Sequence, residues 1–564
     1  MAKDYSQLSK EELLEIIGKL ESRKKYGLIW EDKPEDVAER AKVELPVLKA
    51  VKKLDIQSSE KDPVNILIEG DNYHALSVLN FTHAGEIDLI YIDPPYNTGA
   101  KDWKYNNDYV DGNDPWRHSK WVSMMHKRLV LAKRLLKEDG ALICAIDDYE
   151  LNTLGLILEE LFPAHDRSLV IVEHHPQGAG STTISRTHEY AYVLTPQGQG
   201  IDGREVSSEE GKWSLKRSGQ GENNWRANRP NQFFAILVDE KNRKVVGVGP
   251  SIPRDQKKYP LGKTPEGYLR IYPLDRNNEE RVWRYNRETM QKLIADDQIE
   301  YTKAGALVVK KNGVVAAPIF SVWKGARYNA GTNGSNLLSQ ILGKVNAFPY
   351  PKSLYTVMDM VEMIVKNKKN AIVLDFFAGS GTSGHAVLEL NKKDNGYRSF
   401  ILCTNNENNI CEEVTYARIK KVMKGYTPKR GGEKVGGLGG NLKYFRTAFV
   451  KRSASKDNMK VRLTNECTEM ICLREGVFDE VKATADYKIF KQGDKVLAVY
   501  YSLERDALKD LRKDLNKIEG HKFLYCFTLD PLGLSKSDFI GWEDVVLEPI
   551  PQKILDVYKQ IYEY

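Results

Sequence analysis

Short apolar runs followed by turn residues recur in the first third of the chain and indicate buried strands. Residues 65–70 and 87–93 are rich in Ile, and residues 140–147 form a third run of this kind. Continuous apolar runs of this length are typical of parallel strands that are covered on both faces. Residues 119–137 have helical periodicity and a basic end. The order of these segments predicts an α/β domain that begins near residue 62.

The same pattern resumes over residues 345–425. Here residues 371–377 and 399–403 are predicted strands, and residues 381–393 and 410–424 are predicted helices. Each predicted helix directly follows a predicted strand, which is the order expected of a parallel sheet. The two stretches therefore predict two parts of α/β structure with a long interruption between them.

The rest of the chain has a different character. Polar, aromatic and basic residues interleave over residues 165–330, and six glycines in residues 431–441 predict a flexible connector. Alternating residues around Gly493-Asp494 predict a hairpin, followed by a charged helix over residues 504–518. Near the N-terminus, residues 8–26 predict an amphipathic helix.

These patterns predict six segments along the chain. They are an N-terminal helical region (1–60), the first half of an α/β core (61–164), an insert (165–330), the second half of the core (331–428), a Gly-rich linker (429–441) and a C-terminal α/β domain (442–564). A length of 564 residues agrees with this division, because about 150 residues per domain corresponds to three or four domains.

Composition excludes several classes of protein. Apolar residues make up 41% of the chain and charged residues 29%, which is a globular profile. The net charge of +6 is too small to indicate nucleic-acid binding by itself. No apolar run approaches the ~20 residues of a membrane span, and we expect a cytoplasmic protein. Six cysteines without a C-x-x-C pair predict a reducing compartment, and no histidine pair suggests a metal site.

A glycine-rich loop between a predicted strand and a predicted helix is the first candidate for chemistry. Gly379, Gly381 and Gly384 match G-x-G-x-x-G, and Glu407 follows the next strand, where an acid accepts hydrogen bonds from a ribose. A dinucleotide and S-adenosylmethionine both fit this pattern. Asp375, just before the loop, disfavours phosphates and suits a methionine ammonium group.

Residues 93–96, Asp-Pro-Pro-Tyr, end a predicted buried strand. The two prolines fix the backbone and remove two donors. An acidic acceptor, a rigid carbonyl and an aromatic ring are thus presented together at the carboxyl end of a strand, where open α/β sheets bind ligands. Asp93 and the Pro94 carbonyl suit the two N–H groups of an exocyclic amine, and Tyr96 suits stacking on a planar base.

The DPPY and FAGSGT motifs together resemble those of the amino-methyltransferases that methylate adenine N6 or cytosine N4 in DNA. DPPY precedes FAGSGT, an order similar to that of the β class, and the resemblance covers residues 62–425. It implies a Rossmann-like mixed-sheet core, S-adenosylmethionine as cofactor, flipping of the target base, and adenine N6 as the acceptor. It also implies catalytic roles for Asp93, Pro94, Pro95 and Tyr96, and cofactor contacts by Asp71, Lys352, Asp375, Phe377, Gly379, Ser380, Gly381, Thr382 and Glu407.

The long insert, the FPYPKSL segment (348–354) and the C-terminal domain look most like the modification subunits of type III restriction–modification systems. This resemblance implies a homodimer, double-stranded DNA as substrate, and a restriction subunit as partner, since the chain carries no helicase or nuclease motif. The FPYPKSL segment lacks the H-P-T-Q-K-P form common in the class.

The insert carries a basic stretch over residues 211–230 in the place where this family holds its DNA reader. Basic side chains suit phosphates and guanine edges, and asparagines suit adenine. The candidate DNA contacts are Lys212, Lys216, Arg217, Asn223, Asn224, Trp225, Arg226 and Arg229.

Three other functions stay open on the sequence. Cytosine-N4 methylation uses the same amine contacts. A dinucleotide oxidoreductase would explain the glycine loop but not DPPY. A non-catalytic DNA-recognition subunit would bind DNA without transferring a methyl group.

Overall fold

The computed structural model describes residues 9–10, 13–14, 30–106, 108–178, 183–201, 204–206, 213–219, 221–310, 315–428, 432–453, 455–530 and 532–562. The chain forms two compact units, Ile201–Ile319 and the remainder, Met1–Gly200 with Phe320–Tyr564. The helix predicted over residues 8–26 lies almost entirely outside the described residues. No described helix is both long enough and apolar enough to cross a membrane.

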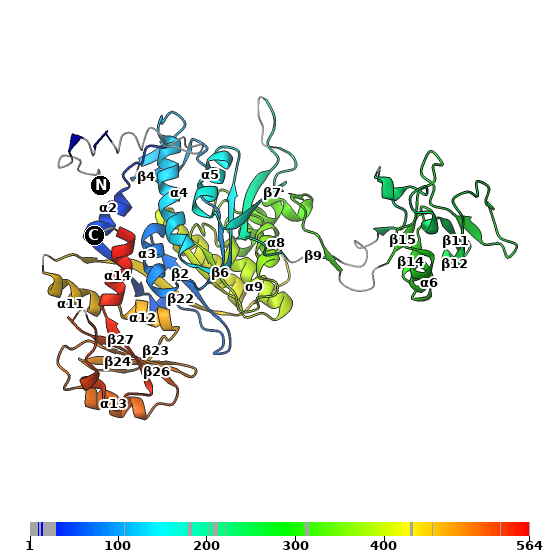
Figure 1. Ribbon diagram of the computed structural model, residues 1–564. Helices are drawn as coiled ribbons and strands as arrows, with labels where there is room; N and C mark the ends of the chain where they lie inside the picture. The colour runs from blue at the N-terminus through cyan, green and yellow to red at the C-terminus, as the bar shows by residue number, and fades with distance from the viewer. Residues whose placement is uncertain are drawn as a thin grey trace. The chain divides into compact units, whose positions relative to one another are not determined.

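A ten-stranded mixed sheet forms the centre of the larger unit (Figure 1). Six neighbouring strands run parallel in its middle, and antiparallel pairings occur toward its two sides, which confirms the predicted mixed-sheet α/β fold. In spatial order the strands are β1 (Glu44–Ala50), β22 (Asn441–Lys451), β2 (Val64–Glu69), β19 (Ser399–Thr404), β18 (Ile372–Asp375), β3 (Ile87–Ile92), β6 (Leu136–Ile146), β8 (Glu189–Pro196), β7 (His165–Val172) and β17 (Val322–Trp323).

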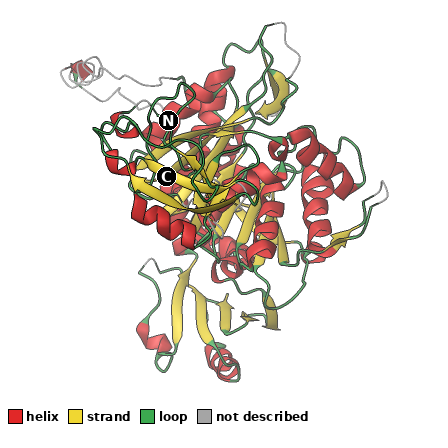
Figure 2. Ribbon diagram, turned by 90° about the vertical axis from the view of Figure 1, so that its right-hand side faces the viewer, coloured by secondary structure: helices red, strands yellow, loops and turns green. Residues whose placement is uncertain are grey.

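Helices lie on both sides of these strands (Figure 2). One group consists of α2 (Asp36–Val43), α3 (Asn72–Thr82), α4 (Arg117–Lys133) and α5 (Leu151–Leu161), and the other of α7 (Leu337–Leu342), α8 (Leu354–Val365), α9 (Thr382–Asp394) and α10 (Ala417–Lys424). All six residues of β3 are buried. The continuous apolar runs in the sequence therefore mark strands whose two faces are both covered.

The smaller unit is built from short strands and one helix. Its core contains Phe234, Ile236, Trp283 and Met290. Its elements are β9 (Arg204–Val206), β10 (Trp213–Ser214), β11 (Phe234–Asp239), β12 (Lys244–Ser251), β13 (Leu269–Ile271), α6 (Arg287–Ala295), β14 (Ile299–Tyr301), β15 (Leu307–Val309) and β16 (Val315–Ala317).

The C-terminal part carries a second, five-stranded sheet and packs on the main core. Tyr558 is buried and donates a hydrogen bond to Pro46 O. The elements of this part are α11 (Lys456–Glu466), α12 (Thr468–Glu475), β23 (Asp479–Ala483), β24 (Tyr487–Gln492), β25 (Lys495–Tyr500), α13 (Leu508–Asn516), β26 (His521–Phe527), β27 (Val545–Ile550) and α14 (Gln552–Tyr562). Two small antiparallel pairs, β4 (Ala100–Tyr105) with β5 (Asp108–Asp111) and β20 (Gly425–Tyr426) with β21 (Val435–Gly436), complete the unit.

The segment boundaries differ from the sequence prediction at three places. β7 and β8 pair within the main sheet, so residues 165–196 belong to the core and not to the insert. β22 lies beside β2, so the main sheet takes the first strand assigned to the C-terminal domain. β1 pairs with β22 within the region predicted as helical. All three depend on pairing with residues far away in sequence, which local patterns do not contain.

Candidate active site

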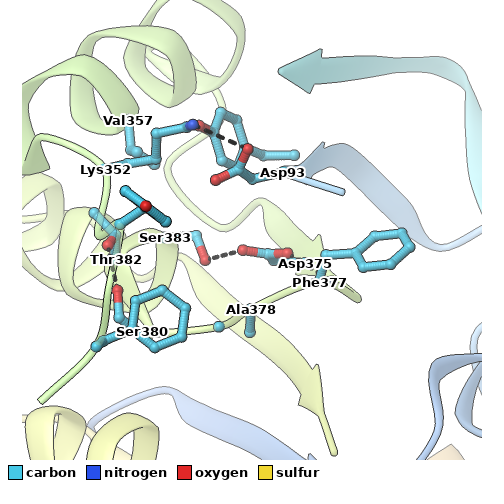
Figure 3. Close-up of a pocket in the computed structure, with 13 residues that line it drawn as sticks. Asp93, Lys352, Val357, Asp375, Phe377, Ala378, Ser380, Thr382 and Ser383 are labelled. Atoms are coloured by element: carbon cyan, nitrogen blue, oxygen red, sulfur yellow. Dashed lines mark hydrogen bonds and ion pairs between the residues drawn. The ribbon is translucent and has the colours of Figure 1, made fainter. Parts of the chain in front are cut away.

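The two motifs found in the sequence meet in one pocket. β18 and β3 are parallel neighbours, with Val373 opposite Leu89, so Asp375 and Asp93 end adjacent strands at the same edge of the sheet. Both carboxylates line one pocket, with Lys352 and Gly379 among its walls, and Figure 3 shows Asp93, Lys352 and Asp375 around it.

The backbone after Asp93 is held in place by side chains from helices of one face. Trp121 donates its indole N–H to Pro95 O at 2.7 Å. Asn97, which is fully buried with a φ of 58°, donates to the Glu150 carboxylate at 2.5 Å. No described residue donates to Pro94 O. The corner is therefore rigid, and its Pro94 carbonyl stays available as an acceptor.

Lys352 joins the corner to β8. Its ammonium nitrogen lies 3.1 Å from Asp93 Oδ1 and 2.8 Å from Glu189 Oε2, and it also contacts the Tyr96 hydroxyl. Tyr96 donates to Glu189 Oε2 at 3.2 Å. The Lys352 side chain is 12% exposed and that of Glu189 7%. Four side chains from three separate parts of the chain thus form one network.

Two carboxylates share one ammonium group in this network. Burial raises the pKa of Asp93, against the opposing effect of Lys352. Burial acts to raise the pKa of Glu189 as well, but Lys352 and other neighbours hold it below its ordinary value. Burial opposes the charge on Lys352, yet the two carboxylates raise its pKa and keep it protonated. With both carboxylates ionised, two negative charges face one positive charge, and the network suits a second positive group.

The glycine loop brings backbone and hydroxyl groups to the pocket. Gly379 has a φ of 46° and Gly381 a φ of 74°, conformations that favour glycine. A Cβ on Gly384 would lie 2.9 Å from the side chains of Leu402 and Ile419, so this glycine allows α9 to pack closely on β19 and α10. Thr415 fixes the loop by donating to Gly379 O at 2.6 Å.

Asp375 is a buried carboxylate without a cationic partner among the described residues. Ser383 donates to its Oδ2 at 2.5 Å, and the backbone N–H of Phe377 donates to its Oδ1 at 2.9 Å. Burial raises the pKa of Asp375 to about 7, although both hydrogen bonds oppose the shift. Such a carboxylate is suited to a ligand that carries a positive charge.

The other two predicted cofactor acids follow neighbouring strands, since β2 and β19 are paired. Asp71 caps α3 by accepting from the backbone of Tyr73 at 2.8 Å. Glu407 lies 2.5 Å from the Lys104 ammonium group and accepts from the Tyr109 hydroxyl at 3.2 Å, both from the β4–β5 hairpin. Neither acid lines the pocket that contains Asp93 and Asp375.

The predicted DNA contacts of the insert fall into two groups. Arg226 is 4% exposed, and its guanidinium donates to Glu280 and to the carbonyls of Pro253 and Gln256. The prediction that Arg226 contacts DNA is therefore wrong, because its charge stabilises the fold of the insert. Asn223 is exposed.

The other candidates that the structure describes are only partly buried. Trp225 is stacked under Arg281, whose guanidinium carbon lies 3.3 Å from the ring centroid. Lys216 donates to Leu274 O at 2.7 Å. Arg217, Asn224 and Arg229 are half-buried. Lys212 lies outside the described residues.

Three residues that support the site carry no motif of their own in the sequence, namely Glu189, Glu150 and Arg418. Glu189 contacts Lys352 and Tyr96, Glu150 accepts from Asn97, and Arg418 donates to Thr382. Their common signal is a charged residue next to buried apolar positions, but such residues are frequent and only the fold shows which ones face the motifs.

The chain is similar in sequence to known DNA-modifying enzymes. A family described as DNA methylase matches residues 87–415. The chain is 30% identical to the type III restriction-modification enzyme EcoPI Mod subunit of Escherichia phage P1, over 70% of this chain and 66% of that protein.

Two further relatives have similar identities. The chain is 29% identical to the StyLTI Mod subunit of Salmonella typhimurium, over 65% of this chain and 57% of that protein. It is also 29% identical to the type II methyltransferase M.KpnI of Klebsiella pneumoniae, over 60% of this chain and 79% of that protein. The chain thus spans just under two thirds of the EcoPI Mod subunit and somewhat over half of the StyLTI Mod subunit.

Proposed function

Because the chain belongs to the DNA methylase family, we propose that it transfers a methyl group from S-adenosylmethionine to adenine N6 in double-stranded DNA. The observation that carries the proposal is the single pocket in which Asp93, the amine-holding candidate, faces Asp375 and the glycine loop. A dinucleotide oxidoreductase would leave the Asp93–Tyr96 corner without a role.

The pocket residues fit the cofactor. Asp375 is buried and lacks a cation, so it suits the methionine ammonium group. Phe377, Gly379, Ser380 and Thr382 also line the pocket, and Gly381 lies between them at the start of α9, so this segment presents backbone and hydroxyl groups to a ligand. Lys352 borders the same space. When bound, S-adenosylmethionine supplies a methyl group activated by a positively charged sulfur.

Asp71 and Glu407 are suited to the nucleoside end of the cofactor. Glu407 follows β19, the neighbour of β18, and Asp71 follows β2, the next strand along the sheet. Glu407 would exchange its Lys104 and Tyr109 contacts for ribose hydroxyls. This assignment predicts that the β4–β5 hairpin changes its contacts when cofactor binds.

The Asp93–Tyr96 corner would hold the target amine. A base stacked in a duplex cannot reach the pocket, so the base must be flipped out. Asp93 and Pro94 O then accept the two amine hydrogens, which draws the nitrogen lone pair toward the methyl donor. Tyr96 stacks on the base, and Pro95, held by Trp121, keeps the corner rigid.

The uncompensated negative charge of the network favours the reaction electrostatically. Positive charge develops on the amine nitrogen as the methyl group is transferred. When both carboxylates are ionised, Asp93 and Glu189 carry two negative charges against the one positive charge of Lys352. The site therefore stabilises this cation with groups that are already in place. Asp93, whose pKa is raised by burial, can then accept the proton that the nitrogen loses.

The chain would act as the modification subunit of a type III-like system, as a homodimer that works with a restriction subunit. Similarity to the EcoPI and StyLTI Mod subunits supports this assignment. The insert would contact DNA through Lys212, Lys216, Arg217, Asn223, Asn224, Trp225 and Arg229.

The test is the base composition of DNA from a methylation-free host that expresses the protein. We expect N6-methyladenine at one recurring sequence by single-molecule sequencing and by mass spectrometry of nucleosides, and none with Asp93→Ala. N4-methylcytosine in place of N6-methyladenine would overturn the choice of base. DNA binding without any methylated base would favour the non-catalytic recognition subunit.

A further inference from the structure

Arg418 lies on α10 directly behind the glycine loop and is fully buried. Its Nη1 donates to Thr382 Oγ1 at 2.8 Å, to Ser380 Oγ at 3.2 Å and to Ser380 O at 3.3 Å. Its Nε has no hydrogen-bond partner among the described residues. The guanidinium is thus directed at the two hydroxyl residues that line the pocket.

No carboxylate pairs with this guanidinium in the described part of the chain. Its remaining contact is His385, whose Nδ1 lies 3.3 Å from Nη2. Burial lowers the pKa of His385 to about 4, so the ring is neutral and accepts at Nδ1. Glu389 reaches only the far side of that ring, 3.4 Å from Nε2. A buried positive charge with neutral contacts is costly, and burial lowers the pKa of Arg418 to about 9.

The hydrogen bonds of Arg418 determine what the two hydroxyls can offer to the pocket. A hydroxyl has one proton and two lone pairs. Ser380 and Thr382 both accept from Arg418, and their oxygens lie 3.1 Å apart, so one proton is used between them. The other proton remains for a ligand, and an acceptor atom on the ligand would use it.

The start of α9 adds donors at the same place. The helix begins at Thr382, and no side chain caps it. The first N–H groups of a helix lack partners within the helix and attract anions. The buried guanidinium, the remaining hydroxyl proton and the helix start without a side-chain cap therefore all favour a negative group beside Ser380 and Thr382, while the carboxylate of Asp375 is held by Ser383 of the same turn.

We infer that Arg418 is a positioning residue for the carboxylate of the cofactor's amino-acid end, acting through Ser380, Thr382 and the start of α9. The inference rests on the proposed function, since S-adenosylmethionine carries both charges of an α-amino acid. Asp375 would bind the ammonium group and the Arg418 wall the carboxylate. Each buried charge that lacks a partner in the protein would then gain one from the ligand.

The test compares two ligands that differ only in the carboxylate. Dissociation constants of S-adenosylmethionine and of its decarboxylated form are measured by calorimetry for the full chain, for Arg418→Met and for Arg418→Lys. Lys421→Met is the matched control, because Lys421 lies on the same helix and donates to the carbonyls of Ile341 and Leu342.

The wild-type chain should bind the carboxylate-bearing ligand more tightly, and Arg418→Met should reduce this preference by about tenfold or more, as expected for loss of a buried charge that acts on a ligand anion. Arg418→Lys should retain part of the preference, and Lys421→Met all of it. If Arg418 had only a structural role, its loss would weaken binding of both ligands equally. The ratio of the two dissociation constants would then stay unchanged, and this result would overturn the inference.

The readout keeps the two proposals apart. If the wild-type chain binds neither ligand, the proposed function fails. If it binds both but the ratio does not depend on residue 418, only the role of Arg418 fails. Should Arg418→Met not fold, the ratio for Arg418→Lys and for Thr382→Val decides, because each variant keeps the core filled while it weakens the same wall, and an unchanged ratio in both overturns the inference.

Discussion

Lys352 and Asp93 form a partly buried ion pair in the proposed active site, with 3.1 Å between the ammonium nitrogen and Asp93 Oδ1. The pair occupies the carboxylate that is proposed to bind the target amine. A second carboxylate, Glu189, lies closer to the same nitrogen, at 2.8 Å. Lys352 can therefore remain paired when Asp93 turns to a substrate.

Replacing Asp93 with Asn tests the acceptor role with little change in shape. We expect methyl transfer to fall at least 100-fold, because the amide retains one acceptor but loses the negative charge that stabilises the developing cation. Binding of DNA and cofactor should change little. Methylation of a defined duplex with tritiated cofactor measures the rate, and a variant that keeps near wild-type kcat would exclude Asp93 from the chemistry.

Glu189→Gln tests whether the second carboxylate keeps Asp93 available. In this variant Lys352 has only Asp93 as an anionic partner, so the ion pair competes with the target amine. We expect kcat to fall by about 10-fold or more while cofactor binding is retained. Adding Lys352→Met should restore part of the loss, because Asp93 is released.

Glu138→Gln serves as the control for that experiment, since Glu138 is an exposed acid on β6 away from the pocket. Single-turnover rates for the four proteins give the comparison. A double variant that is slower than Glu189→Gln would contradict the argument, because it would show that Lys352 assists Asp93 directly.

Asp375 predicts a pH dependence for cofactor binding. Its pKa of about 7 in the folded, unliganded protein means that the carboxyl group is largely neutral below pH 7 and charged above it. Only the charged form attracts an ammonium group, so affinity for S-adenosylmethionine should rise as pH increases from 6 to 8. Titration calorimetry across this range measures it, and Asp375→Asn should remove the rise.

The same residue predicts how stability depends on pH. The folded-state pKa of Asp375 lies above its ordinary value of 3.8, so the folded protein binds more protons than the unfolded chain between these values. Stability of the unliganded protein therefore falls as pH rises through this window. Asp375→Asn should stabilise the unliganded protein at pH 8 by ~1–4 kcal/mol, since one pH unit of displacement corresponds to about 1.4 kcal/mol. Denaturant unfolding at pH 5 and pH 8 checks the sign, and a lower stability of the variant at pH 8 would contradict it.

Two substitutions in the insert should have different effects, one on DNA binding and the other on stability. Arg217→Ala should weaken binding to all duplexes and reduce the salt dependence of the affinity, because loss of a phosphate contact releases fewer counterions. Arg226→Ala should instead destabilise the insert, since its guanidinium holds Glu280 and two backbone carbonyls. Affinity at several salt concentrations and thermal unfolding distinguish the two. An unchanged salt slope for Arg217→Ala would remove it from the interface.

The sequence by itself determined the central strands, the fold class and the two motifs of the pocket. Residues 87–93 and 371–377 are continuous apolar runs, and a strand covered on both faces needs such a run, so local pattern was sufficient to find β3 and β18. The motif residues follow these strands directly. Their local chemistry, an acid before two prolines and an acid before a glycine turn, is visible without a partner.

The tertiary structure decided which charges face one another. Lys352, Glu189 and Asp93 are far apart in the chain and meet because Lys352, just before α8, reaches both the end of β3 and the start of β8. The buried state of Arg226 and Arg418 was likewise hidden, because a basic residue has the same local pattern whether it reaches solvent or the interior. Burial and ion pairing depend on long-range packing, and that is why the electrostatics of the site appeared only with the fold.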